Sequence, residues 1–181
     1  MRRTWLARRG ARAGAILAAI AVALLAADRG GDSGPNRGTA PTAEGSKPTP
    51  AVVTRVVDGD TIEVRLPDGA EEDVRYIGVD TPESVDPDEP PQCFGHRAAE
   101  LNRRLVEGRR VELRFDAERR DRYGRLLAYV RRGEVLVNAE LVRRGRARTL
   151  TIAPNDSRAR LFDKLQTAAG RAGRGLWGAC R

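Results

Sequence analysis

The segment 51-AVVTRVVDGDTIEVRL-66 decides the fold. It is rich in Val, Thr and Ile, which favour strands, and the turn-forming stretch Asp58-Gly59-Asp60-Thr61 interrupts it in the middle. The segment therefore predicts strands joined by a tight turn. After a second turn at Pro67-Asp68-Gly69, the apolar stretch from Val74 to Val79 predicts a further strand.

The remainder of the chain alternates between strand and helix patterns. Further strands are expected at 111–115, 126–131 and 135–137, which brings the expected number to about five. Apolar residues at helical spacing predict helices after Gly95, over 138–144 and near the C-terminus, the last from Leu161 to Ala172. Short strands with helices interleaved later predict an α+β domain that is mainly β, a small closed barrel with about three helices packed at one side.

Charge is distributed unevenly along the chain. The 33 Lys and Arg against 25 Asp and Glu give a formal net charge of +8, but residues 28–96 carry −9 and residues 97–181 carry +12. An acidic half can bind a cation and a basic half can bind phosphates, so this distribution of charge fits a protein that binds both a metal ion and a polyanion. A solvated, Arg-rich surface is the alternative. The composition excludes a collagen, a coiled coil and a multispan membrane protein.

The N-terminal segment, residues 1–27, has the pattern of an export signal. Arg-rich residues 1–13 precede an apolar run at 15–27 that is short for a membrane span. The segment is either cleaved or kept as an N-terminal anchor. In both cases the positive cluster stays on the cytoplasmic side, so the rest of the chain is expected outside the cytoplasm. Residues 28–50, rich in Gly, Pro, Ser and Thr, are expected to form a flexible linker to a folded domain at 51–181.

The two cysteines meet oxidising conditions if the chain is exported. A disulfide between Cys93 and Cys180 would close a long loop and contribute roughly 4 to 5 kcal/mol in the chain-entropy model. We therefore predict a disulfide, the alternative being two unrelated thiols.

Three polar clusters fall at strand ends or turns. They are Asp58 to Thr61, Arg75 with the following Asp80-Thr81-Pro82-Glu83, and Asp121-Arg122-Tyr123-Gly124-Arg125. Ca²⁺ takes six to eight oxygen ligands, which two aspartates, a backbone carbonyl and waters can supply. Arginine forks match phosphate oxygens, and a further carboxylate beside the metal can deprotonate water. Taken singly, each cluster has a plain alternative, since Asp-Gly pairs build turns and Tyr-Gly-Arg can be a surface hairpin.

In this order, the three clusters resemble those of the staphylococcal nuclease family, over about residues 51–177. The stretches at 127–130 and 137–145 are also similar to that family. The resemblance implies an OB-type barrel with three helices and a Ca²⁺-dependent phosphodiesterase that acts on DNA and RNA. It also implies cleavage of the bond to the 5′ oxygen, which leaves a 3′-phosphate and a 5′-hydroxyl.

The resemblance assigns roles by motif position. Asp60 and Asp80 would supply metal carboxylates, Thr81 a backbone carbonyl, and Glu83 the general base for the attacking water. The remaining residues would contact phosphate: Arg75 and Arg125 at the scissile group, Arg122 and Tyr123 at a neighbouring one. The chain is expected to be a monomer.

Two positions depart from the family pattern. Tyrosines often precede the family's Pro-Asn, which here is Pro154-Asn155, yet this chain has Leu150 and Ile152, so base stacking should be weaker. Arg146 and Arg148 can compensate by contacting phosphate or stacking, or they are solvated charges at a strand end. The alternatives for the whole domain are a nucleic-acid-binding OB module without catalysis and a structural Ca²⁺-binding domain.

Overall fold

The computed structural model describes residues 47–84 and 92–180. The predicted export signal at 1–27 and the linker as far as residue 46 lie outside the described residues. Within the described ranges, no helix is both long enough and apolar enough to cross a membrane.

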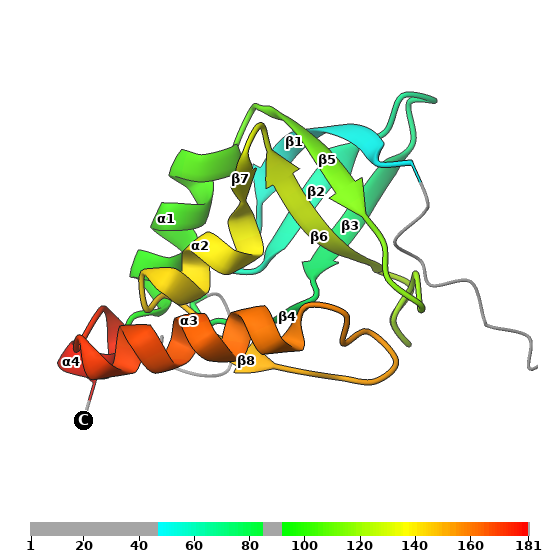
Figure 1. Ribbon diagram of the computed structural model, residues 1–181. Helices are drawn as coiled ribbons and strands as arrows, with labels where there is room; N and C mark the ends of the chain where they lie inside the picture. The colour runs from blue at the N-terminus through cyan, green and yellow to red at the C-terminus, as the bar shows by residue number, and fades with distance from the viewer. Residues whose placement is uncertain (1–46, 85–91, 181) are drawn as a thin grey trace, which may run out of the picture. The chain divides into compact units, whose positions relative to one another are not determined.

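Five strands close into a barrel, as the sequence predicts (Figure 1). They run in the order β3-β2-β1-β5-β6 as antiparallel neighbours, and a parallel pairing of β3 with β6 closes the ring. A short extra strand, β7, pairs with the far edge of β6. The bounds are β1 Thr49–Val56, β2 Thr61–Arg65, β3 Glu71–Tyr76, β5 Arg110–Arg114, β6 Leu126–Arg132 and β7 Val135–Leu136.

Alternating side chains fill the barrel. Val53, Val64 and Val74, from three neighbouring strands, are fully buried. On each strand the residues directly before and after the valine face outward. Leu113 and Val130, from β5 and β6, complete the same apolar cluster. Burial of these aliphatic side chains is the main driving force for folding, since the chain is only 4% aromatic.

The strand expected at Val74 to Val79 is divided in two. β3 ends at Tyr76, and β4, Gly78–Asp80, leaves the barrel to pair with β8, Arg148–Leu150. Gly78 makes the break because it has a φ of +79°, and a Cβ there would overlap the ring of Phe162. The break carries the chain from the barrel wall to Asp80, so it positions one of the predicted site residues.

The three predicted helices are present, with one further short helix (Figure 1). α2 packs against β6 and α3, and α1 packs against β1 and α2. A second apolar cluster of Ile77, Tyr129 and Phe162 joins α3 to the barrel. The bounds are α1 Gly95–Val106, α2 Val137–Arg143, α3 Ala159–Arg171 and α4 Leu176–Ala179.

The predicted disulfide is confirmed. Cys93 and Cys180 are bonded, with their Cα atoms 5.9 Å apart. The bond joins the residues just before α1 to the end of α4, so it ties the C-terminus to the chain that leads into the first helix.

Candidate active site

Asp60 lies at the turn between β1 and β2, and its backbone is fixed from both sides. The Oδ1 atom of Asp58 accepts a hydrogen bond from the Asp60 N–H at 2.8 Å. The Asp60 carbonyl accepts one from the Tyr76 N–H at 2.9 Å, which ties the turn to the end of β3. From α1, the buried Asn102 donates to the Asp58 carbonyl at 3.1 Å. The DGDT turn therefore holds a carboxylate in a fixed place.

Four donors contact the Asp60 carboxylate, the most distant being the Thr61 hydroxyl, 3.4 Å from Oδ1. Its Oδ2 accepts hydrogen bonds from the Thr81 N–H at 2.6 Å and the Thr81 hydroxyl at 2.9 Å. Its Oδ1 lies 2.7 Å from Nη1 of Arg75. Asp60 is only 4% exposed, so these contacts replace the water that the charged group loses.

Arg75 connects the two predicted metal carboxylates. While Nη1 contacts Asp60 and donates to the Val79 carbonyl at 3.0 Å, Nη2 lies 3.2 Å from Oδ1 of Asp80. The Arg75 side chain is 17% exposed and that of Asp80 is 53% exposed. The structure thus brings Asp60, Asp80, Thr81 and Arg75 together, with one carboxylate buried and the other open to solvent.

Burial dominates the electrostatics of Asp60. Loss of solvent raises the pKa of Asp60 to about 7, and the charge of Asp58 adds to this, while Arg75 and the hydrogen bonds from Thr81 oppose it. The ionised form is thus disfavoured by the fold itself. Such perturbed carboxylates are common at functional sites.

The donor atoms fit a hard cation. Carboxylate and carbonyl oxygens are the ligands that Ca²⁺ and Mg²⁺ prefer. The three carboxyl groups of Asp58, Asp60 and Asp80 outnumber the one guanidinium group, that of Arg75, which contacts Asp60 and Asp80. Among residues 47–84 and 92–180 there is no cluster of three or more His, Cys, Asp or Glu side chains arranged to hold a metal. Two carboxylates and the Thr81 carbonyl would therefore leave several coordination positions to water.

Glu83 follows two residues after Thr81, and its backbone is clamped by Gln92. The Gln92 N–H donates to the Glu83 carbonyl at 2.8 Å, and the Gln92 side-chain oxygen accepts from the Glu83 N–H at 3.2 Å. Oε1 of Glu83 accepts from the Ser84 N–H at 2.7 Å. At the start of α1, Gly95 lies so close to the Glu83 carbonyl that a Cβ would overlap it. The sequence did not point to Gln92, because nothing in its local pattern indicates a contact nine residues away.

Arg125 is held by Asp121 in the loop between β5 and β6. Oδ2 of Asp121 lies 2.7 Å from Nε of Arg125, and Oδ1 accepts from the backbone N–H groups of Tyr123 and Arg125 at 2.9 and 3.0 Å. Partial burial alone would raise the pKa of Asp121, but these hydrogen bonds and the Arg125 charge lower it below its usual value. Asp121 was quoted in the sequence motif but given no role, although its spacing of four from Arg125 was a usable signal.

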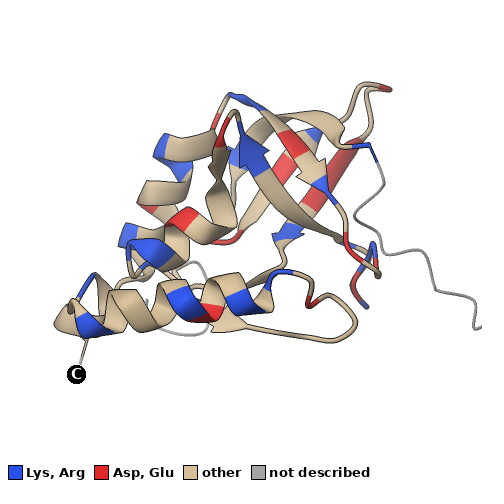
Figure 2. Ribbon diagram, in the orientation of Figure 1, with Lys and Arg blue, Asp and Glu red and all other residues tan. Residues whose placement is uncertain are grey.

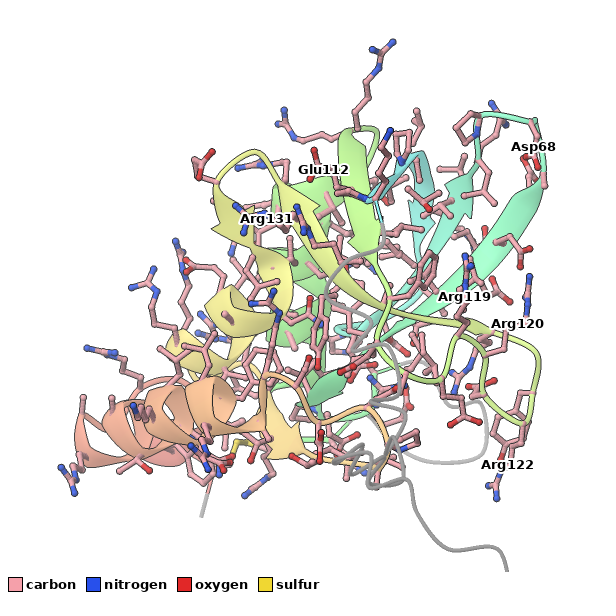
Figure 3. All side chains as sticks on the ribbon, turned by 45° about the vertical axis from the view of Figure 1, so that its right-hand side comes forward. Asp68, Glu112, Arg119, Arg120, Arg122 and Arg131 are labelled. Atoms are coloured by element: carbon pink, nitrogen blue, oxygen red, sulfur yellow. A yellow bond between two sulfur atoms is a disulfide. The ribbon has the colours of Figure 1, made fainter. Side chains whose placement is uncertain are left out.

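The two arginines predicted to bind the scissile phosphate, Arg75 and Arg125, line one cleft of about 560 Å³. Arg75 lies on the barrel side of it and Arg125 on the loop side, together with Arg122 and Tyr123. Tyr123 is 68% exposed, and the guanidinium of Arg122 lies 4.7 Å from its ring centre. Figure 3 shows the Arg122 side chain pointing away from the barrel.

The loop that carries Arg125 is anchored at two further points. Arg120 forms an ion pair with Glu72 of β3 at 2.7 Å, and Figure 3 shows it closer to the barrel than Arg122. The Asn155 side chain accepts from the Glu118 N–H and donates to the Glu118 carbonyl, at 2.8 and 2.9 Å. Sequence analysis missed the role of Asn155 because the two segments lie 37 residues apart.

Residues 73–179 match the protein family described as staphylococcal nuclease homologue. The chain belongs to the staphylococcal nuclease family. The matched residues run from the middle of β3 to the end of α4, and so include Arg75, Asp80, Glu83 and Arg125. The family resemblance and the barrel that it implies are both confirmed.

Individual members of the staphylococcal nuclease family are similar to most of the chain. It is 41% identical to a thermonuclease of Staphylococcus intermedius over 126 residues, which cover 70% of this chain and 74% of the relative. It is 39% identical to the thermonuclease of Staphylococcus hyicus, over 69% of this chain and 73% of that protein. Endonuclease YncB of Bacillus subtilis is 40% identical over 61% of this chain and 53% of its own length.

Proposed function

We propose that the chain is a nuclease that hydrolyses phosphodiester bonds in DNA and RNA and requires Ca²⁺. The observation that carries the proposal is Arg75, which is bound to the buried Asp60 and the open Asp80 on the wall of a cleft that also contains Arg125. Related proteins that are named thermonuclease and endonuclease support the same activity.

Asp60, Asp80 and the Thr81 carbonyl would hold the cation. When bound, Ca²⁺ supplies positive charge beside the reacting phosphate and favours deprotonation of water. Thr81 has a second task, because its N–H and hydroxyl already fix the orientation of the Asp60 carboxylate. The dry environment of Asp60 strengthens its interaction with any cation that enters.

Glu83 would act as the general base. It takes a proton from a water molecule whose oxygen forms the new bond to phosphorus, while the bond to the 5′ oxygen breaks and that oxygen takes a proton from solvent. The products are a 3′-phosphate and a 5′-hydroxyl. The clamp by Gln92 keeps the Glu83 backbone in place, so that little ordering is needed during the reaction.

Arg75 and Arg125 would stabilise the transition state. Negative charge develops on the phosphoryl oxygens, and the guanidinium groups of two arginines that line the same cleft can donate to them. Arg122 and Tyr123 would contact a neighbouring phosphate. Since phosphate contacts carry no sequence information, this site suits cleavage of both DNA and RNA at many sequences.

We also propose that the enzyme works outside the cytoplasm as a monomer. The Cys93–Cys180 disulfide favours an oxidising compartment, and the N-terminal sequence has the order of an export signal. Mass measurement of the exported protein distinguishes a cleaved signal from a retained anchor.

The direct test is digestion of single-stranded DNA and of RNA by the full-length protein, with Ca²⁺ or with chelator, followed by analysis of the product ends. We expect calcium-dependent products with 3′-phosphates, and a loss of roughly 10²- to 10⁴-fold in kcat for Glu83→Gln. Glu134→Gln is the matched control, since Glu134 is fully exposed at the β6–β7 turn. Binding without cleavage would instead identify a non-catalytic nucleic-acid-binding module.

A further inference from the structure

The cleft continues into a surface that the proposed reaction does not use. Leu150 lines the cleft and is 40% exposed, and Arg148, two residues before it on β8, is also exposed. Because alternate residues of a strand point the same way, Arg148 extends the face that bears Leu150. In the β4–β8 pairing, Arg148 lies opposite Asp80. The strand therefore leads from the cleft, past a proposed metal ligand, to an arginine.

Arginines on this surface are supported by aromatic rings. The guanidinium carbon of Arg148 lies 4.8 Å from the ring centre of Trp177. That of Arg146 lies 4.7 Å from the ring centre of Phe94, and that of Arg97 lies 5.4 Å from the same ring. A guanidinium over a ring uses its face for the cation–π contact, which leaves its in-plane N–H groups to bind an acceptor.

These three arginines lack acceptors. Among the residues that the structure describes, the side chains of Arg97, Arg146 and Arg148 form no hydrogen bond and no ion pair, and the Nε and Nη1 atoms of Arg146 are buried without a partner. Burial, followed by repulsion from Arg97 and Arg104, lowers the pKa of Arg146. Two guanidinium groups that contact one ring and repel each other, a repulsion that Glu100 offsets in part, are an arrangement that an anion would stabilise.

Neighbouring arginines behave differently. Arg143 and Arg144 both contact Glu140, and Arg104 contacts Glu100 at 2.6 Å. Figure 2 shows both basic and acidic residues on α1, α2 and α3, and acidic residues at the start of β3. Arg97, Arg146 and Arg148 belong to the part of the sequence, residues 97–181, that carries a net charge of +12.

We propose that Arg148, with Arg146 and Arg97 at the Phe94 ring, forms an arginine track that binds phosphates of a single nucleic-acid strand beyond the cleft. The inference rests on the proposed nuclease function and extends it to the binding of longer substrates. Leu150 and Ile152 provide no aromatic ring for stacking, although the exposed Tyr123 lines the cleft, so phosphate contacts beyond the cleft would add to the affinity for a long strand. The track supplies these contacts.

The test compares a 20-nucleotide DNA strand with a dinucleotide, which is too short to reach the track from the cleft. For Arg146→Ala/Arg148→Ala in the full-length chain, the ratio of the long-strand KM to the dinucleotide KM should rise roughly tenfold. The slope of log affinity against log salt should fall by about 1.4, the loss of two single-strand phosphate contacts. The matched control is Arg109→Ala/Arg110→Ala, which removes the same charge at the exposed start of β5.

Binding of a labelled 20-nucleotide strand to the Glu83→Gln protein separates this inference from the proposed reaction. If wild type cleaves nothing but the track variant still weakens binding more than the control variant does, the track stands and the nuclease proposal fails. If cleavage occurs and the KM ratio is unchanged, or if both double variants shift it equally, the track is wrong. Arg148→Ala alone provides the same readout should the double variant fold poorly.

Discussion

Two aspartate–arginine pairs, Asp60–Arg75 and Asp121–Arg125, each place an arginine in the lining of the cleft, and they differ in what they do for stability. In each pair the closest oxygen and nitrogen lie 2.7 Å apart. Nevertheless, the pKa of Asp60 is raised and that of Asp121 is lowered. Asp60 is buried next to Asp58, whereas Asp121 lies in a surface loop and accepts two backbone hydrogen bonds besides its arginine.

The difference separates a functional charge from a structural one. The ionised form of Asp121 stabilises its loop, because its partners favour the charged state. The ionised form of Asp60 destabilises the metal-free fold, because burial disfavours the charge more than Arg75 favours it. A carboxylate that is kept at a cost in stability points to selection for binding or catalysis.

Asp60→Asn should give the largest and most diagnostic effect. We expect activity to fall by at least about 100-fold, since a metal carboxylate is lost. At pH 7.5 without metal, the free energy of unfolding should nevertheless rise by about 4 kcal/mol, because the buried charge is removed. Urea unfolding with chelator measures the second quantity. A variant that is both inactive and less stable would place Asp60 among the structural charges.

Arg75→Ala tests the same pair from its other side. Removing the guanidinium raises the pKa of Asp60 further, so at pH 9, where Asp60 of the folded wild type is ionised, we expect a loss of about 3 kcal/mol in unfolding free energy. The loss should shrink in the Asp60→Asn background, where no charge remains to be neutralised. Equal losses in both backgrounds would show that Arg75 stabilises the fold through packing and its bond to Val79 rather than through Asp60.

The pH dependence of the unfolding free energy should report the raised pKa of Asp60 directly. Between its ordinary pKa of 3.8 and about 7, the folded protein holds a proton on Asp60 that the unfolded chain has released. The unfolding free energy of the metal-free protein should therefore fall as pH rises through this window, relative to Asp60→Asn. We expect a relative change of about 4 kcal/mol, measured by urea unfolding at pH 4 and pH 7.5 with chelator. Parallel curves for the two proteins would rule out the raised pKa.

Asp121→Ala should have the smallest effect. The pair is partly exposed, so we expect a loss of about 1 kcal/mol at neutral pH. Because the folded pKa is lowered, this loss should vanish as pH falls below 3.8, the opposite sign to Asp60. A decrease in kcat with little change in KM would show that Asp121 positions Arg125 for the transition state.

Local patterns predicted the barrel and the disulfide, but only part of the site. Val64 and Val74 lie in strands whose side chains alternate, so their pattern is visible in the sequence. β8 was missed because Arg148-Thr149-Leu150 is largely exposed and becomes a strand only by pairing with β4. The four-residue helix α4 is likewise too short to show a period.

The site motifs were visible, whereas their supports were not. DGDT and Asp80-Thr81 stand out as turn sequences rich in carboxylates, yet the hydrogen bonds from Thr81 to Asp60 join residues 21 apart. Asn102, Gln92 and Asn155 act through contacts that only the fold creates. Single polar side chains of this kind have no local signature.

A calcium titration of stability tests most directly whether Asp60 is kept ionised in order to hold a cation. Unfolding free energies of wild type and Asp60→Asn would be measured at increasing Ca²⁺ concentration. Wild type should gain about 2.7 kcal/mol at a hundredfold excess over its dissociation constant, while the variant should stay nearly constant. Equal stabilisation of both proteins, or none in wild type, would contradict the role of Asp60 as a calcium ligand.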